Sequence, residues 1–390
     1  MAPRLLARAL PLLALALAAA GPATEGPHED ACSLLQVASR STFIVESLTI
    51  GKDERTVGLK VLRNRATNES VDIAYTFGGK VDSIRLKSPV THRVRELLVS
   101  SGRDAERLLT MGWAANELLL PFANRIANGT YELDGTTYNM RRNKAPNAIH
   151  GFLIGKRMQV VAENASAHSA SVTLAYEFNE ANDPKTQPVG YPFLLRAEVT
   201  YALDAQGVSI TTTVKNLARQ GGPLPFYMGM HPYFVVEDVS KSTVVFDACS
   251  AWNEIVVDKD MIPTTATTPF SGFRGEPIGG SRLEPTSWDT GFKATASQAA
   301  CPELRTEVFD PAQGDSGVLW MKSPEFQWLQ VFTGGAPALA QAVAIEPMSG
   351  ETDAYNNGQA VELLLQAGET WEGTFGFALS APSDAALGRA

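Results

Sequence analysis

The sequence predicts an all-β protein whose antiparallel sheets pack on each other. From Phe43 onwards, short runs alternate apolar and polar residues, and this period of two is typical of half-buried strands. Helical periodicity is scarce, while the 32 glycines and 23 prolines punctuate the chain at intervals that suit turns. Strands that do not alternate with helices favour antiparallel over parallel sheets, so we expect stacked antiparallel sheets rather than a βαβ fold.

The clearest strands form a pair between residues 195 and 214. Apolar or Thr side chains occupy alternate positions of both halves: Leu195, Ala197, Val199, Tyr201 and Leu203, then Val208, Ile210, Thr212 and Val214. The turn residues 204–207 join the halves, so this pair is predicted to be an antiparallel hairpin.

The C-terminal part shows the same pattern. Residues 361–365 form a predicted strand, and a turn at Gly368-Glu369 follows. After that turn, one face of a last strand carries Trp371, Phe375, Phe377 and Leu379. A short helix is expected only around residues 104–109.

One large domain is the simplest organisation of the 390 residues. The chain has no internal repeat and no linker rich in Pro, Gly or Ser, and β domains of more than 200 residues are common. We therefore expect a single β-sandwich domain over residues 43–382, preceded by a signal peptide at 1–20 and an N-terminal tail at 21–42.

The first twenty residues have the order of a secretory signal peptide. Arg4 and Arg8 precede an apolar stretch of about 12 residues, which ends in small residues at 18–20. A membrane anchor would need about 20 apolar residues. The sequence thus predicts a secreted or luminal protein of the secretory pathway that is not held in a membrane after cleavage.

Composition excludes some classes of partner. Hydrophobic residues make up 44% of the chain and charged residues 19%, a balance that supports a packed core. The net charge of −9 opposes binding to nucleic acid or to anionic membranes, because both need clustered Lys and Arg.

Two further features bear on the compartment. Acceptor triplets for N-glycosylation begin at Asn68, Asn128 and Asn164. The three cysteines, Cys32, Cys249 and Cys301, lack zinc-finger or CxxC spacing. An odd number leaves at least one cysteine unpaired if a disulfide forms, so the sequence leaves the pairing open.

Three residues stand in settings that suit chemistry. His150 precedes Gly151, and His231 is flanked by Gly229, Pro232 and aromatic residues that could wall a pocket. Glu346 follows an apolar run and precedes a proline, which predicts a carboxylate at a strand end facing a loop. From these settings alone, both histidines could equally be structural and Glu346 an exposed edge residue.

Several blocks together resemble the aldose 1-epimerase (galactose mutarotase) family. They are residues 121–135, 147–151, 229–234 and 330–334, and the run from Glu346 through Asp353, Ala354, Asn356 and Gly358. They follow the family's order and spread over most of the mature chain. The resemblance implies a large antiparallel β supersandwich with a sugar-binding cleft.

The resemblance also implies roles. Glu346 would be the general base and His231 the general acid. Arg125 and His150 would hold sugar hydroxyls, with Asn124 and Gln330 nearby and Asp289 as a further hydroxyl ligand. The expected partner is a free aldohexose such as glucose or galactose.

These residue types suit the interconversion of α and β anomers. One group takes the proton of the anomeric hydroxyl while another protonates the ring oxygen, and the roles reverse on closure. A carboxylate is available as base, and a nearby carboxylate can bias histidine toward its protonated form. No step transfers electrons or needs a metal ion, so we expect no cofactor and no metal.

The sequence also departs from the family. Phe152 stands where a second glycine is frequent, and Lys156-Arg157-Met158 where a tryptophan is usual. Such changes indicate a divergent member and affect substrate preference more than the reaction.

Parts of the sequence are also compatible with other functions. A secreted, non-catalytic carbohydrate-binding protein could use the same scaffold. A lyase or hydrolase is a second alternative, although a hydrolase would need two flanking carboxylates. Residues 314–317 resemble the nucleophile segment of serine proteases, but no histidine has the matching surroundings and the segment suits a turn.

Overall fold

A computed structural model describes most of the chain beyond residue 40. Residues 41–390 form one compact unit. The predicted signal peptide and most of the predicted tail lie outside the described residues. In that described part, no helix has the length and apolar character needed to cross a membrane. The ranges described are 41–112, 114–179, 190–219, 222–270, 274–278, 288–334, 339, 341–358 and 363–389.

The N-terminal sheet is an antiparallel meander. Each strand pairs with the next along the chain, starting at Phe43, where the sequence predicts the first strand. The strands are β1 (Phe43–Ile50), β2 (Val57–Asn64), β3 (Ser70–Ala74), β4 (Lys80–Lys87) and β5 (Val94–Glu96).

A large antiparallel sheet contains the predicted hairpin. Leu195 pairs with Asn216 and Asp204 with Gly207, and burial alternates along both strands as their sequences predict. The C-terminal strand lies beside this hairpin. In order across the sheet, the strands are β11 (Gln159–Ala165), β12 (Ser169–Phe178), β13 (Leu195–Asp204), β14 (Gly207–Asn216), β28 (Thr370–Ser380), β24 (Ser316–Lys322), β23 (Glu303–Phe309), β18 (Thr243–Phe246) and β21 (Arg274–Pro277).

A third antiparallel sheet, here called the site sheet, carries several of the predicted site residues. Its order is β20 (Pro263–Phe270), β19 (Trp252–Val257), β22 (Asp289–Ala294), β25 (Trp328–Thr333), β26 (Ala342–Met348), β16 (Gly229–Met230) and β6 (Leu118–Leu119), with β17 (Tyr233–Val235) also on β26.

Short elements complete the unit. The predicted helix is present as α2 (Ala105–Thr110), and the Asp104 side chain caps it by accepting a hydrogen bond from the Arg107 N–H. The described part of the predicted strand at 361–365 is β27. The remaining elements are β7 (Arg125–Ile126), β10 (Ala148–Ile149), β8 (Thr130–Leu133), β9 (Thr136–Asn139), β15 (Leu224–Pro225), β27 (Leu364–Leu365), η1 (Asp53–Arg55) and η2 (Ala127–Gly129).

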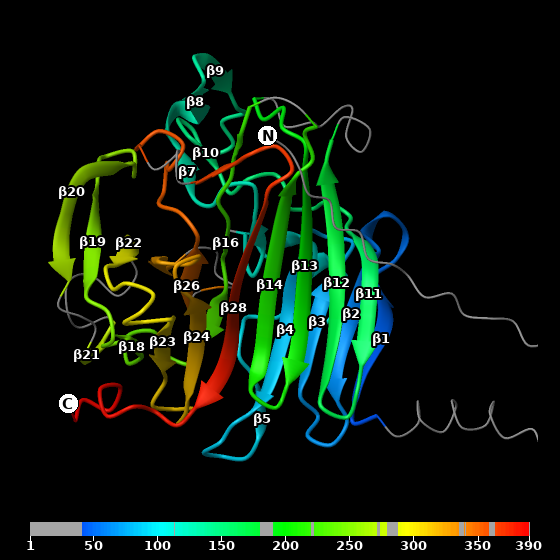
Figure 1. Ribbon diagram of the computed structural model, residues 1–390. Coiled ribbons are helices and arrows are strands. Elements are labelled where there is room, and N and C mark those ends of the chain that lie inside the picture. Colours follow the sequence, from blue (N-terminus) through cyan, green and yellow to red (C-terminus); the bar gives the residue numbers. More distant parts are fainter. Residues whose placement is uncertain are drawn as a thin grey trace, which may run out of the picture. The chain divides into compact units, whose positions relative to one another are not determined.

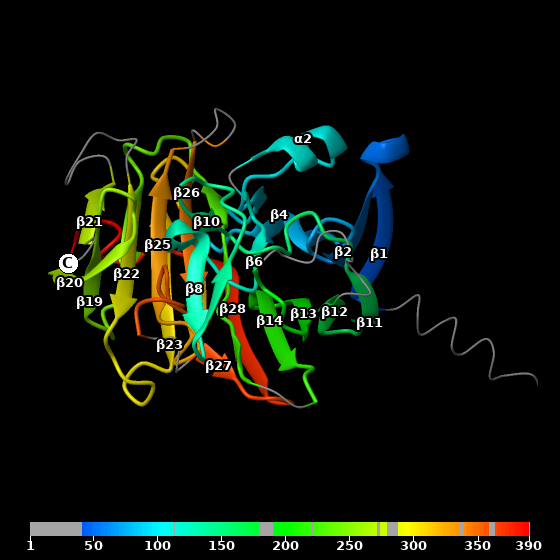
Figure 2. The same ribbon diagram turned by 90° about the horizontal axis from the view of Figure 1, so that it is seen from above.

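The sheets pack face to face around a continuous apolar core. Strands β1 and β2 contact β12, so the N-terminal sheet covers one end of the large sheet (Figures 1 and 2). The site sheet covers the other end, where the Phe234 ring on β17 lies 6.0 Å from the Phe377 ring on β28. The site sheet therefore has a rigid backing, and the predicted all-β sandwich fold is confirmed.

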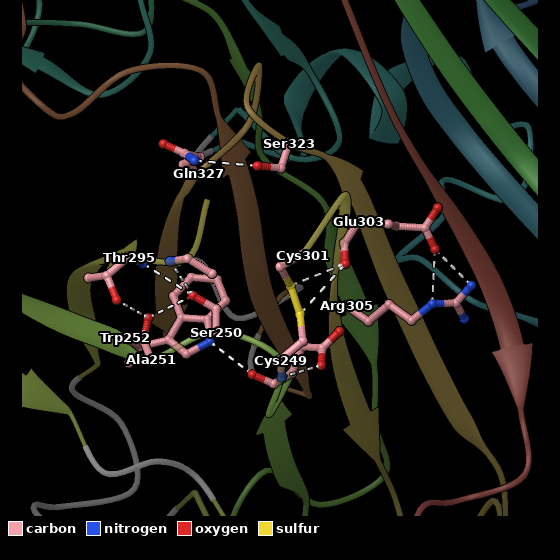
Figure 3. Close-up of a disulfide and its surroundings, with 12 residues drawn as sticks. Cys249, Ser250, Ala251, Trp252, Thr295, Cys301, Glu303, Arg305, Ser323 and Gln327 are labelled. Atoms are coloured by element: carbon pink, nitrogen blue, oxygen red, sulfur yellow. Dashed lines mark hydrogen bonds and ion pairs between the residues drawn. A yellow bond between two sulfur atoms is a disulfide. The ribbon is translucent and has the colours of Figure 1, made fainter. Parts of the chain in front are cut away.

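Cys249 and Cys301 form a disulfide, which Figure 3 shows with its surroundings. It joins the loop after β18 to the loop before β23, across 52 residues of sequence. Beside it, the Thr295 N–H donates to the Ala251 carbonyl at 2.9 Å, so the two loops that carry the cysteines are also joined through their backbones. Cys32 lies outside the described residues.

Loss of this disulfide should destabilise the fold. Because the bond closes a long loop, its removal is expected to lower the free energy of unfolding by about 4 kcal/mol. The measurement is urea unfolding of the Cys249→Ser/Cys301→Ser variant, with reduced wild type as the matched control. Unchanged stability in both proteins would contradict the expectation.

Candidate active site

The site is built on a pair of buried side chains, His231 and Glu346. On β26, Tyr233 pairs with Ala344 and Gly229 with Met348, so His231 lies between these pairs and faces Glu346. The His231 Nε2 is 3.3 Å from Glu346 Oε1. The two residues are 5% and 2% exposed. A proton can therefore pass between them away from bulk water.

Glu346 does not lie where the sequence predicts. The strand β26 continues through Pro347 to Met348, and Pro347 pairs with Leu329. The expectation that the proline ends the strand and leaves Glu346 facing a loop is wrong. A proline removes only one hydrogen-bond donor from a strand, and β26 keeps its pairing with β25 on one side. The carboxylate is thus fixed in the interior of a sheet.

A row across three strands leads outward from this carboxylate. Gln330 on β25 pairs with Glu346 on one side and with Gly291 on β22 on the other. A Cβ on Gly291 would lie 3.2 Å from Gln330 Oε1, so the glycine leaves room for that amide. The Gln330 Nε2 donates to Asp289 Oδ1 at 2.6 Å. Gln330, predicted to lie near the sugar, thereby orients the Asp289 carboxylate.

Arg125 completes this side of the site. Its Nη2 lies 3.2 Å from Asp289 Oδ2, and its Nη1 donates to Asn124 Oδ1 at 2.9 Å. The Arg125 and Asp289 side chains are 12% and 31% exposed, more than the buried pair. The site therefore opens on the side of these two charged groups, where a ligand's hydroxyls can reach them.

His150 lies beside both His231 and the strand that carries Arg125, with the two imidazole ring centroids 5.5 Å apart. It follows β10, and its N–H donates to the Asn124 carbonyl at 3.0 Å. Gly151 has φ of 63°, and a Cβ there would lie 2.2 Å from the Leu120 carbonyl oxygen. Only glycine fits this close approach of two backbones, which sets the direction of the His150 segment.

The site holds buried polar atoms that the protein does not satisfy. Among the described residues, His150 Nδ1, His231 Nδ1 and Glu346 Oε2 have no hydrogen-bond partner. Leaving such atoms unpaired costs free energy, and native proteins retain them mostly where they have a use. Groups of this kind on three neighbouring residues suit a ligand rich in hydroxyls.

Burial sets the proton distribution. It raises the pKa of Glu346 well above its ordinary value, an effect that Asp289 strengthens and Arg125 opposes. It lowers the pKa of His231 to about 3. The expectation that a nearby carboxylate raises the pKa of His231 is therefore wrong, because desolvation of the imidazolium outweighs it. Without a ligand, the His231–Glu346 pair holds one proton, and this proton lies mainly on Glu346.

These directions give a pH dependence of stability. Unfolded, the two side chains titrate at their ordinary pKa values of 4.5 and 6.5. In the unfolded chain, Glu346 and His231 together bind two protons below pH 4.5, one proton between pH 4.5 and 6.5, and none above pH 6.5. In the folded protein, the pair binds one proton from about pH 3 upward. Stability rises with pH where the unfolded state binds more protons, and falls where it binds fewer. The pair's contribution should therefore fall below pH 4.5 and above pH 6.5.

Urea unfolding at several pH values checks this profile. Each limb should have a slope of about 1.4 kcal/mol per pH unit. Glu346→Gln should abolish the alkaline fall, and His231→Gln the acid fall below pH 4.5, relative to wild type. Burial, the main cause of the lowered pKa of His150, is the same in all three proteins, so most of its contribution cancels in the differences. Identical profiles would contradict the pKa directions.

Asp353 is a functional residue that the sequence interpretation assigned no role. Its N–H donates to the Arg125 carbonyl at 2.8 Å, and its Oδ1 accepts from the Ala127 N–H at 2.8 Å. Asn356 Nδ2 also donates to this oxygen at 2.7 Å. Asp353 thus fixes the short strand that carries Arg125. In the sequence, Asp353 was marked by its place in a block that resembles the aldose 1-epimerase family.

Phe152, one of the departures, packs into the fold. Its ring lies edge-on to Phe122 at 5.4 Å and tilted against Tyr191 at 6.2 Å.

Within the described chain, Asp247, Cys249 and Cys301 form a group of metal-ligand type, and the disulfide uses both of its sulfurs.

Solved structures similar to this one share its fold. A galactose mutarotase-like protein of Clostridium acetobutylicum has a TM-score of 0.69 and 18% identity, over 87% of this chain and 99% of its own. A galactose 1-epimerase of Lactobacillus acidophilus has a TM-score of 0.68 and 12% identity, over 87% of this chain and all of its own. At these identities the likeness concerns the fold alone.

Curated relatives match more locally. The Escherichia coli uncharacterized protein YihR is 28% identical over 65% of this chain and 75% of its own length. Human galactose mutarotase is 28% identical over 38% of this chain and 41% of its own. Levilactobacillus brevis maltose epimerase is 30% identical over 38% and 42%. The match spans about two fifths of the length of these two enzymes.

A family model covers most of the described fold. The model of aldose 1-epimerase matches residues 60–378, from β2 to the C-terminal strand β28. This range includes all the residues of the site described above. The chain therefore belongs to the aldose 1-epimerase family.

Proposed function

We propose that this protein is an aldose 1-epimerase that interconverts the α and β anomers of a free aldohexose. The observation that carries the proposal is the buried His231–Glu346 pair, whose Nε2 and Oε1 atoms lie 3.3 Å apart. An acid and a base must act on the two oxygens of one hemiacetal carbon, and this pair supplies both within 3.3 Å.

The chemistry begins with a proton shift and ring opening. The pair's proton, which lies mainly on Glu346 without a ligand, first moves to His231 across the 3.3 Å contact. The Glu346 carboxylate then takes the proton of the anomeric hydroxyl while His231 gives its proton to the ring oxygen. The bond from C1 to the ring oxygen breaks and C1 becomes an aldehyde. Rotation about C1–C2 presents the other face. On closure the ring hydroxyl attacks C1, His231 takes its proton and Glu346 returns a proton to the carbonyl oxygen.

The other site residues hold the sugar during this rotation. The guanidinium of Arg125 has donors in a fixed fork, and Asp289 offers carboxylate oxygens beside it. His150, whose ring centroid lies 5.5 Å from that of His231, adds a further polar group to the site. These groups would bind the hydroxyls that do not react, so that the open chain closes again in the same place.

Polarimetry tests the proposal. Freshly dissolved α-D-glucose or α-D-galactose should relax faster with the protein than in a buffer blank. His168→Ala, an exposed histidine in the turn between β11 and β12, should leave the acceleration unchanged. No acceleration together with saturable sugar binding in calorimetry would instead support a non-catalytic carbohydrate-binding protein.

We also propose that the protein matures in the secretory pathway. The Cys249–Cys301 disulfide suits an oxidising compartment, and the glycosylation candidates Asn68, Asn128 and Asn164 are all exposed. Expression of the full chain in eukaryotic cells tests this. Expected are a mature N-terminus near residue 20 and a mass reduced by peptide N-glycosidase. An intact Met1 with no change in mass would overturn the proposal.

A further inference from the structure

Asn116 is a polar residue in the fully buried interior, directly behind His231. It is 0% exposed and has φ of 55°. In this left-handed region asparagine is tolerated better than most residues. Because a buried amide costs free energy unless its atoms are paired, the hydrogen bonds of Asn116 indicate what it does.

Three hydrogen bonds hold the backbone on both sides of the catalytic histidine. The Asn116 N–H donates to the His231 carbonyl at 2.8 Å, and the His231 N–H donates to the Glu117 carbonyl at 3.1 Å. The Tyr233 N–H donates to Asn116 Oδ1 at 3.0 Å. The segment from His231 to Tyr233 is thus held at both ends by one dipeptide.

This support falls where the sheet cannot provide it. Strand β16 ends at Met230 and β17 begins at Tyr233, so His231 and Pro232 lie in the break between them. Pro232 has no N–H to donate, although its carbonyl accepts from the Ile345 N–H of β26 at 3.3 Å. The Asn116 side chain supplies the acceptor for the next N–H along the chain, at Tyr233.

The dipeptide is itself anchored from behind. The Asn116 Nδ2 donates to the Val99 carbonyl at 2.7 Å, and the Val81 N–H donates to the Asn116 carbonyl at 3.1 Å. The Glu117 carboxylate lies 3.5 Å from the Nζ of Lys80, a buried lysine on β4. Through these contacts, the N-terminal sheet helps to fix the position of His231.

We infer that Asn116 is a positioning residue for the acid–base pair: its amide holds the His231 segment so that the imidazole stays within reach of Glu346. The inference rests on the proposed function. Small displacements matter in such a pair, since a shift of about 1 Å of a reacting group can cost about a hundredfold in rate.

The chain offers a matched control in Asn216. It is 2% exposed, its Nδ2 donates to the Leu365 carbonyl at 2.8 Å, and its Oδ1 accepts from the Ala218 N–H at 2.9 Å. Asn216 thus makes the same kind of side-chain bonds to backbone, at the end of β14 outside the site. A purely structural role of a buried asparagine would be lost equally in either variant.

The experiment compares Asn116→Ala, Asn116→Asp and Asn216→Ala by polarimetry and thermal unfolding. Asn116→Ala is expected to lower kcat by about a hundredfold while KM stays within about threefold, because binding groups are untouched. Asn116→Asp keeps the Oδ1 acceptor, so its kcat should be about tenfold higher than that of Asn116→Ala. Asn216→Ala should lose stability but keep its kcat.

A second readout separates this inference from the proposed function. The imidazole signals of the five histidines are recorded by NMR, and His231→Gln assigns that of His231. The His231 signal should shift in both Asn116 variants and stay in Asn216→Ala. A wild type without turnover would refute the proposed function alone. A folded Asn116 variant with full kcat or an unmoved His231 signal, or an equal loss of kcat in Asn216→Ala, would overturn the positioning role. If Asn116→Ala does not fold, Asn116→Asp decides.

Discussion

Replacing Glu346 by glutamine is expected to lower kcat for mutarotation by a factor of about 100 or more. Glutamine has the same shape and can still contact His231 Nε2, but it cannot take a proton from the anomeric hydroxyl. The fold should survive, because in the sugar-free protein burial already keeps the Glu346 carboxyl largely protonated and uncharged. Polarimetry at saturating sugar measures the loss of turnover.

Glu96→Gln is the matched control for this substitution. Glu96 is half-buried, and desolvation raises its pKa to about 7, but it lies on β5 of the N-terminal sheet. Its replacement should leave kcat unchanged. Equal losses in both variants would show that removal of a partly desolvated carboxyl, and not of the base, lowers the rate.

Replacing His231 by alanine should cost a similar factor of about 100 or more in kcat, because the ring oxygen then loses its proton donor. The double variant with Glu346→Gln should be no worse than the poorer single variant, since groups that act as one unit lose their function together. Stopped-flow polarimetry of the three proteins measures this. Multiplicative losses would mean that the two residues act independently.

Arg125→Ala provides the contrasting case. Its guanidinium bonds Asn124 and Asp289 but neither His231 nor Glu346, so its loss should appear mainly as a higher KM.

The His231→Ala prediction has its own contradicting outcome. If His231→Ala raised KM and left kcat unchanged, His231 would be a binding residue and the assignment of the acid would be wrong.

Local patterns predict the fold well. The hairpin of β13 and β14 follows from its alternating residues, and the short helix expected around residues 104–109 is present as α2. Each of these signals is contained in a few neighbouring residues. The Cys249–Cys301 pairing is different, because the two residues are 52 positions apart and spacing alone does not select a partner.

The residue types of the site can be predicted from the sequence, but their placement in the sheet and their pKa values are harder to predict. The family resemblance points to His231, Glu346 and Arg125, which the structure brings into one site. The local rule for proline placed Glu346 at a strand end, whereas pairing with β25 keeps Pro347 within β26. The pKa of His231 depends on burial by distant segments, and the Asn116 side chain bonds to backbone atoms of segments far away in the sequence, so neither leaves a local pattern.

The placement of His231 and Glu346 on the site sheet, and of Arg125 and His150 on or beside the short β7–β10 ribbon, has a consequence for how the protein can diversify. Under the proposed function, the reactive pair lies on or beside the site sheet, whereas recognition is divided between this sheet, which also carries Asp289 and Gln330, and the ribbon. Changes in the ribbon and its neighbouring loops can retune which sugar is accepted while the proton-transfer pair stays intact. Exchange of the segment 121–151 between relatives should therefore transfer part of the sugar preference without rebuilding the catalyst.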